Sequence, residues 1–277
     1  MATNPTDTAA AGLLKVPGAQ LYYEVRGEGS LIVLAGAPMD AAAFAPLAEL
    51  LATDHTVLTT DPRGINRSRL DDPGQDSTPQ LRADDLSRLI AHIDAGPAVA
   101  VGSSGGAVSV LALAQRRPDQ VHTIIAHEPP LIELLDDREQ LRAGTEDIVA
   151  TYLAGEVTGA WKKFFAQANL TMPEPLIEQM FGGERDPQQV ADERRWFAHE
   201  MRASTYWRPD PAALRAAPTR IVVGIGADSA GQLCDRTSRA LARSLGTEPT
   251  AFPGGHTGFV ETPDAFAARL RTVIRKG

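Results

Sequence analysis

The chain has 277 residues, a formal net charge of −8, 43% hydrophobic residues and 22% charged residues. The length fits one large α/β domain, and the negative charge without a basic stripe argues against nucleic acid as a partner. No apolar run reaches the roughly 20 residues that cross a membrane, and residues 1–13 lack a secretory signal, so we expect a soluble, cytoplasmic protein with no membrane partner.

Short apolar runs alternate with longer amphipathic stretches along most of the chain. This alternation predicts an α/β fold, in which helices cover both faces of a mainly parallel sheet. The predicted strands are residues 19–25, 31–34, 56–60, 98–101, 121–126 and 221–225. The predicted helices are residues 41–51, 78–93, 105–115, 231–245 and 263–274.

The interval 129–217 breaks this rhythm because it contains helical patterns and no strand pattern. An interval of this size is too long for a loop. Nine of the 15 aromatic residues lie within it, including all three tryptophans. These rings are predicted either to form a small core of the helical insertion or to line a substrate cavity.

Residues 99–108 predict a strand that enters the motif Gly-x-Ser-x-Gly and continues as a helix. Glycines at 102 and 106 would let strand and helix approach closely while the turn holds Ser104 in a strained backbone conformation. The hydroxyl would stand at the helix N-terminus, where backbone N–H groups favour developing negative charge. Ser104 is therefore the candidate nucleophile, whereas Ser103 lacks a glycine frame.

On these residues the chain resembles the α/β-hydrolase family, from about residue 14 to the C-terminus. In that family the order is nucleophile, acid and histidine, with the histidine on a loop after the last strand. His256 lies in such a late segment, between glycines that suit a loop carrying an imidazole to Ser104. The resemblance implies an α/β-hydrolase core of residues 1–128 and 218–277, with residues 129–217 inserted as a helical cap.

The resemblance also implies an acidic residue after the penultimate strand, and Asp228 follows the run 221–225. Its spacing from the preceding glycines differs by one residue from the family's usual Gly-x-x-Asp. Glu128, at the end of the strand 121–126, lies where some relatives carry the acid instead. We expect Asp228 to orient His256, with Glu128 as the alternative.

An oxyanion hole is expected from the backbone N–H groups of Gly105 and Ala37. Ala35 stands where the family commonly has the histidine of His-Gly-x-Pro, but that change leaves the backbone donors in place. Residues 61–68 match a further family stretch, Asp-x-Arg-Gly-x-Gly-x-Ser, which resembles a structural turn more than a site.

Other candidate residues concern the substrate pocket. His127 follows a strand at the sheet edge where ligands bind, so it is predicted to be either a structural histidine or a substrate contact. The single cysteine, Cys234, excludes an internal disulfide and is interpreted as a buried structural thiol. The candidate aromatic pocket residues are Trp161, Phe165, Trp196 and Trp207.

Together these residues predict a serine hydrolase that cleaves an ester, lactone or related acyl bond of a small, partly apolar molecule. No metal or organic cofactor is expected, because the sequence lacks the metal-binding and nucleotide-binding motifs. The same residues could instead cleave a carbon–carbon or amide bond, or transfer an acyl group to a nucleophile other than water. A ligand-binding protein without catalysis is the remaining alternative.

Overall fold

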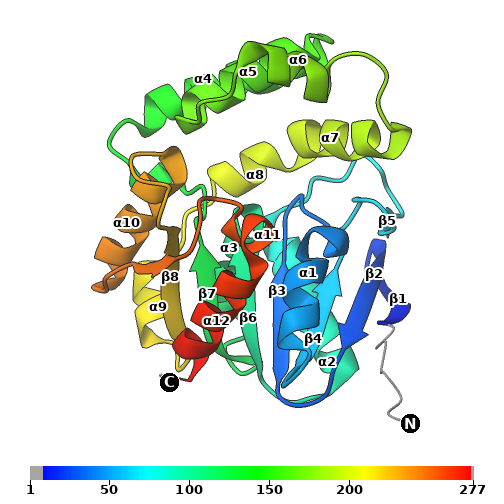
Figure 1. The fold of residues 1–277 in the computed structure, drawn as a ribbon, viewed down its shortest axis with the longest axis vertical. Helices are drawn as coiled ribbons and strands as arrows, with labels where there is room; N and C mark the ends of the chain where they lie inside the picture. The colour runs from blue at the N-terminus through cyan, green and yellow to red at the C-terminus, as the bar shows by residue number, and fades with distance from the viewer. Residues whose placement is uncertain (1–8, 276–277) are drawn as a thin grey trace.

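The computed structural model describes residues 9–275, and its centre is one mixed sheet (Figure 1). The strand order is β1-β2-β4-β3-β6-β7-β8-β9, with β5 paired to β2, and every pair from β4 to β9 is parallel. The strands are β1 (Ala10–Val16), β2 (Ala19–Arg26), β3 (Leu31–Ala35), β4 (Thr56–Thr60), β5 (Arg69–Leu70), β6 (Ala98–Ser103), β7 (Val121–His127), β8 (Arg220–Gly226) and β9 (Thr250–Phe252).

Successive side chains of the central strands enter two separate cores, one on each face of the sheet. In β3, for example, Ile32 and Leu34 pack with α1 (Ala41–Leu51) and α12 (Pro263–Ile274), whereas Leu31 and Val33 pack on the other face. That second face is covered by α2 (Pro79–Ile93), α3 (Gly105–Arg116) and α10 (Leu233–Leu245). The alternation follows from the two-residue period of a strand.

All helices between β7 and β8 belong to one insertion. They are η1 (Ile132–Leu134), α4 (Arg138–Leu153), α5 (Val157–Ala168), α6 (Glu174–Phe181), α7 (Pro187–His199), α8 (Met201–Thr205) and α9 (Pro211–Ala216). Helices α7 and α8 lie between the sheet and the outer layer of α4 to α6 (Figure 1). Helix α9 instead packs against α3 and α10 of the sheet domain.

The predicted α/β-hydrolase fold with a helical insertion is therefore confirmed, and each predicted strand and helix is present. The sequence prediction missed the edge strands β1, β5 and β9, which are short or partly exposed and so carry a weak apolar pattern. Within residues 9–275, none of the helices combines the length and apolar character needed to span a membrane.

Candidate active site

Ser104 lies at the sharp turn between β6 and α3. Its backbone has φ 56° and ψ −122°, a conformation that side-chain-bearing residues rarely adopt. A Cβ atom on Gly102 would lie 2.2 Å from the carbonyl oxygen of Gly106, and one on Gly106 would lie 2.0 Å from the carbonyl oxygen of Ala35. The two glycines are therefore required, because β6, α3 and the end of β3 approach one another closely at this turn.

The carboxyl ends of four adjacent parallel strands bring the candidate residues to one edge of the sheet. Ser103 is in register with His127, and His127 is in register with Gly224. The backbone N–H of Ser104 donates to the carbonyl oxygen of His127 (2.9 Å), and the N–H of Glu128 donates to that of Gly224 (3.0 Å). Ser104 and Glu128 consequently occupy neighbouring positions where ligands bind in open α/β sheets.

Glu128 holds the imidazole of His256. The distance from Glu128 Oε2 to His256 Nδ1 is 2.6 Å, and the other carboxylate oxygen accepts from the backbone N–H of Gly226 at 2.8 Å. The Glu128 side chain is fully buried, whereas that of His256 is 25% exposed. Such an arrangement fixes the tautomer of the ring and leaves Nε2 as the nitrogen that Glu128 does not bind.

The two partners shift each other's pKa in opposite directions. Burial alone would raise the pKa of Glu128, but the hydrogen bond from His256 and its charge hold that pKa at about 2. Burial would lower the pKa of His256, but the neighbouring Cys234 and Glu128 raise it well above its ordinary value. Both shifts favour the carboxylate–imidazolium form of the pair.

Asp228, the expected partner of His256, is replaced in that position by Glu128. Asp228 is exposed, and its backbone N–H donates to the carbonyl oxygen of Gly254 (3.1 Å). The strand β8 ends at Gly226 in a tight turn, closed by the bond from Ser229 N to Gly226 O (3.1 Å), and this turn leaves Asp228 on the surface. The irregular glycine spacing in the sequence was the signal of this difference.

The two expected oxyanion donors are adjacent. A Cβ atom on Gly105 would lie 2.4 Å from the carbonyl oxygen of Ala37 and 3.1 Å from its side chain. Gly105 begins α3, so its N–H has no acceptor within the helix. The turn after β3 is tight, because a Cβ atom on Gly36 would meet the carbonyl oxygen of Met39 at 2.1 Å.

Among the residues the structure describes, no hydrogen bond joins the hydroxyl of Ser104 to His256. Catalytic hydrogen bonds in free enzymes are often long and shorten when substrate binds. Ser104 is partly exposed, so a substrate can reach it.

The surroundings of His127 favour the structural one of its two predicted roles over a substrate contact. The side chain is 0% exposed and packs edge-on against Phe252 and Phe266. Its Nδ1 lies 3.4 Å from the Ser103 hydroxyl, and burial lowers its pKa to about 4, so the ring is neutral at physiological pH. Strand alternation explains this position, because His127 shares the face of Ile125 and belongs to the core between β7 and α12.

Three of the four expected aromatic pocket residues form one cluster in the insertion. Trp161 stacks on Phe181 with centroids 4.1 Å apart and on Trp196 at 5.4 Å, and it also contacts Phe165. The indole N–H of Trp161 donates to Glu193 (2.8 Å). These partly buried rings surround the small core of the insertion.

Trp207 lies elsewhere and is not part of this cluster. Trp207 packs against the core between the sheet and helices α2 and α3. It also lines an open hollow together with Thr78, Arg202 and Tyr206. It lies in the part of the insertion between α8 and α9, away from the other rings, and its substrate contact stays a prediction.

The interpretation of Cys234 as a buried structural thiol is wrong. Cys234 is partly exposed rather than buried, in the first turn of α10, and it raises the pKa of His256 from close by. The turn that precedes α10 is joined to the loop that carries His256 by the bond from Asp228 N to Gly254 O. No sequence pattern marks this approach, because the two residues lie on separate turns.

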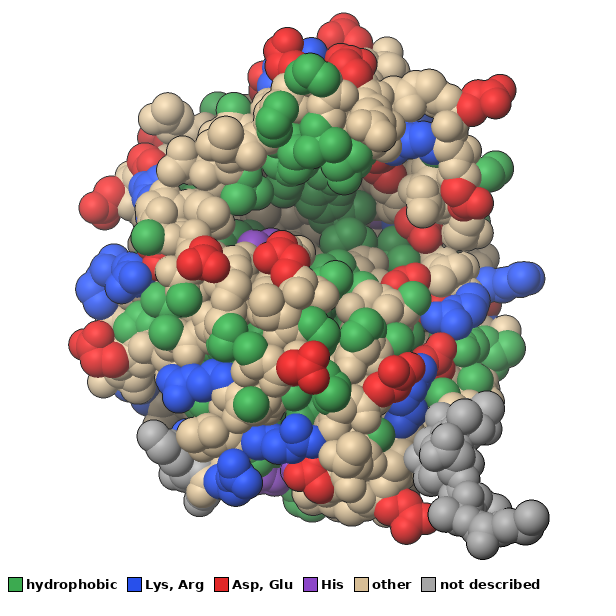
Figure 2. Space-filling view, in the orientation of Figure 1, with side chains coloured by type: hydrophobic (Ala, Val, Ile, Leu, Met, Phe, Trp, Pro, Cys, Tyr) green, Lys and Arg blue, Asp and Glu red, His purple; other side chains and the backbone are tan. Residues whose placement is uncertain are grey.

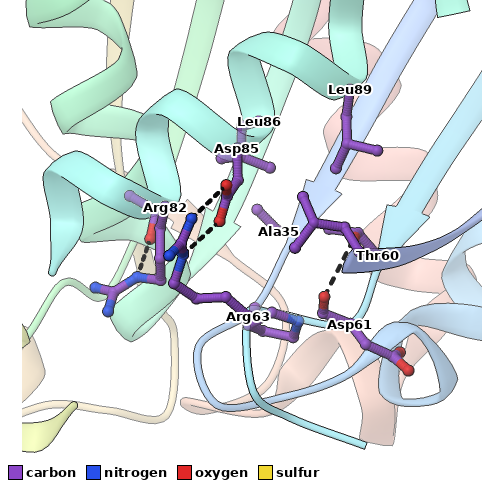
Figure 3. Close-up of a pocket in the computed structure, with 12 residues that line it drawn as sticks. Ala35, Thr60, Asp61, Arg63, Arg82, Asp85, Leu86 and Leu89 are labelled. Carbon is purple, nitrogen blue, oxygen red and sulfur yellow. Dashed lines mark hydrogen bonds and ion pairs between the residues drawn. The ribbon is translucent and has the colours of Figure 1, made fainter. Parts of the chain in front are cut away.

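The segment 61–68 forms a buried polar cluster behind the turn after β3, in agreement with its interpretation as a structural turn. Figure 3 shows Arg63 facing Asp85 of α2, with two hydrogen bonds of 2.7 Å each. Asp61 is fully buried and accepts from the backbone N–H of Ala41 at 2.9 Å. These groups border a cavity of about 20 Å³, enough for about one water molecule.

Comparisons with known proteins agree with this geometry. The Alpha/beta hydrolase family model matches residues 31–269, and the chain belongs to this family. The uncharacterized hydrolase YraK of Bacillus subtilis (strain 168) is 33% identical over 278 residues, which cover 96% of each chain. The chain is thus a hydrolase of the α/β fold with esterase-like structural neighbours.

Two of these neighbours are solved esterases. A thermophilic esterase from Thermogutta terrifontis is 22% identical with a TM-score of 0.65, and the match covers 97% of this chain and 98% of that one. The esterase EaEST from Exiguobacterium antarcticum is 18% identical with a TM-score of 0.71, over 98% of this chain and 100% of that one. At these identities the likeness establishes the shared fold.

Proposed function

We propose that the protein hydrolyses esters of small, partly apolar molecules through an acyl-enzyme on Ser104. The observation that carries the proposal is the 2.6 Å contact between Glu128 and His256, beside a serine held in a strained turn. A buried carboxylate, an imidazole with one free nitrogen and an exposed hydroxyl are the parts of a serine-hydrolase triad. Esterases are among the proteins that share this fold, so we take an ester as the proposed scissile bond.

In the proposed reaction, Ser104 Oγ attacks the carbonyl carbon of the ester and transfers its proton to Nε2 of His256. The backbone N–H groups of Ala37 and Gly105 stabilise the negative oxygen of the tetrahedral intermediate. The imidazolium then protonates the leaving alcohol as the carbon–oxygen bond breaks. Water, activated by the same imidazole, releases the acid and restores the serine, while Glu128 stabilises the positive ring in both halves.

The proposed cap, residues 129–217, accounts for the expected substrate class. The molecule is hollowed between the insertion and the sheet domain, and hydrophobic side chains cover the insertion side of the hollow (Figure 2). The aromatic rings around Trp161 belong to this insertion. An apolar acyl or ring group would bury well against such a wall, so we propose small uncharged esters or lactones as substrates.

The proposal is tested by labelling with a fluorophosphonate, followed by peptide mapping. Wild-type protein should carry the label on Ser104, and the Ser104→Ala variant should neither be labelled nor hydrolyse p-nitrophenyl butyrate. Ser103→Ala is the matched control, because Ser103 is the adjacent serine but is buried, and it should keep the label. Equal labelling of wild type and Ser104→Ala would refute the mechanism, and faster cleavage of the matched p-nitroanilide would refute the ester assignment.

A further inference from the structure

Asn66 has an unusual backbone conformation in the loop between β4 and β5. Its φ is 47°, in the left-handed region that glycine adopts most easily and that asparagine tolerates better than most residues. The family stretch that residues 61–68 resemble has glycine at this position. The backbone alone therefore does not require an asparagine side chain here.

The side chain and backbone of Asn66 bind two different parts of the molecule. Asn66 Nδ2 donates to Asp40 Oδ2 (2.8 Å), and the backbone N–H of Asn66 donates to Asp192 Oδ1 (2.9 Å). Asp192 belongs to α7 in the insertion, whereas Asp40 is the N-cap residue of α1 and accepts from Ala43 N at 3.2 Å. Asn66 thus lies between a cap helix and the segment that follows β3.

That segment also contains the proposed oxyanion donor Ala37. The tight contact between Gly36 and the carbonyl oxygen of Met39 makes residues 36–39 a compact turn, and Asp40 follows it directly. A displacement of Asp40 is therefore transmitted to the donor three residues earlier. On the other side, α7 is fixed to the segment between β5 and α2 by Arg195, which donates to the carbonyl oxygens of Pro73 (2.9 Å) and Gln75 (2.6 Å).

We propose that Asn66 is a positioning residue, which couples helix α7 of the cap to the turn that carries the oxyanion donor Ala37. The proposal rests on the proposed function, because it assigns a role in the same reaction. Asn66 lies between two carboxylates: its side-chain amide donates to Asp40, and its backbone N–H donates to Asp192. Loss of the amide would leave Asp40 without this partner and the turn free to shift.

The test exchanges aspartate and asparagine between positions 40 and 66. In Asn66→Asp, the carboxylates at 40 and 66 repel, so kcat for p-nitrophenyl butyrate should fall about 10- to 100-fold while KM changes less than about twofold. In the double variant Asp40→Asn/Asn66→Asp, the hydrogen bond returns with its direction reversed, and kcat should recover to within about threefold of wild type. A merely structural role would not give this recovery of kcat.

Two further variants keep the test decisive. Asn66→Gly accepts the positive φ, so it should fold with an unchanged melting temperature or a higher one and still lose about 10-fold in kcat. Gln188→Ala is the matched control, because Gln188 also donates to Asp192 (2.9 Å) but does not contact the loop, and it should keep wild-type kcat.

Wild-type kcat in Asn66→Gly, or a double variant no faster than Asn66→Asp, would overturn the proposal. These outcomes differ from a failure of the proposed function. If Ser104→Ala retained turnover, the reaction itself would be wrongly assigned. If turnover required Ser104 but the Asn66 variants kept kcat, only the coupling would be refuted.

Discussion

Glu128 and His256 are 128 positions apart in the chain, yet their side chains form a 2.6 Å hydrogen bond at the edge of the sheet. The carboxylate comes from the end of β7, beside the strand that carries Ser104, rather than from the end of β8. Three measurements on this pair and one on the cluster behind it test what the geometry implies.

The first prediction concerns which carboxylate supports catalysis. Glu128→Gln should reduce kcat/KM by about 1,000-fold or more, because the amide cannot stabilise the imidazolium and favours the wrong tautomer. Asp228→Asn should stay within about twofold of wild type, since that side chain is exposed. Ester hydrolysis by the two purified variants checks this, and the reverse ranking would restore Asp228 as the acid.

The second prediction concerns the pH profile. The general base must be neutral, so the raised pKa of His256 places the acidic limb of kcat/KM above the ordinary histidine value of 6.5. Cys234→Ala removes one of the groups that raise this pKa and should move the limb to lower pH. Initial rates from pH 5 to 10 measure the shift, and a profile identical to that of wild type would show that Cys234 does not act on the imidazole.

The third prediction concerns folding stability. The pKa of Glu128 is lowered from 4.5, so its contribution is complete above about pH 4.5 and is lost as the pH falls toward 2. The pKa of His256 is raised from 6.5, so its contribution is complete below about pH 6.5 and is lost as the pH rises through the raised value. The wild type should therefore exceed Glu128→Gln in free energy of unfolding by the most between about pH 4.5 and 6.5.

Urea denaturation at pH 3, 5.5 and 9 measures this difference. Asp228→Asn serves as the control, because that side chain is exposed at the surface. A difference between wild type and Glu128→Gln that stays constant across the three pH values would contradict the predicted ion pair.

The fourth prediction concerns the buried pair Arg63 and Asp85. Arg63→Met leaves the Asp85 carboxylate without its partner and should lower the free energy of unfolding by about 3–5 kcal/mol. The double variant Arg63→Met/Asp85→Leu removes both charges and should recover most of that loss. Thermal or urea unfolding of both variants measures the coupling, and additive losses would show that the two groups do not interact.

The nucleophile turn could be predicted from sequence because its requirements are local. Gly102 and Gly106 stand at fixed distances from Ser104, and the strand and helix on either side have strong apolar patterns. The acid could not be assigned in this way, since it depends on how the turns after β7 and β8 place Glu128 and Asp228 in space. Both were visible as candidates, and only the three-dimensional arrangement distinguishes them.

The pocket residues were harder to predict for the same reason. The sequence around an aromatic residue in a helical segment does not show what its ring contacts. Trp161 packs in the core of the insertion, whereas Trp207 lines a separate hollow. His127 and Glu128 are adjacent, but His127 ends β7 and packs against phenylalanines, whereas Glu128 lies just beyond the strand with a φ of 53° and reaches His256. Tertiary contacts, which no local pattern specifies, determine these outcomes.

The position of Glu128 also affects how this hydrolase can change. The serine and the carboxylate both precede the helical insertion, and the insertion begins directly after the carboxylate. The turn at residues 227–232 supplies no side chain of the proposed triad, but it supports both of its charged members: Asp228 N donates to Gly254 O in the loop before His256, and the buried Ser229 helps to lower the pKa of Glu128. Redesign of substrate preference must therefore keep this turn as well as the first residues of the insertion, because both hold Glu128 and His256 in place.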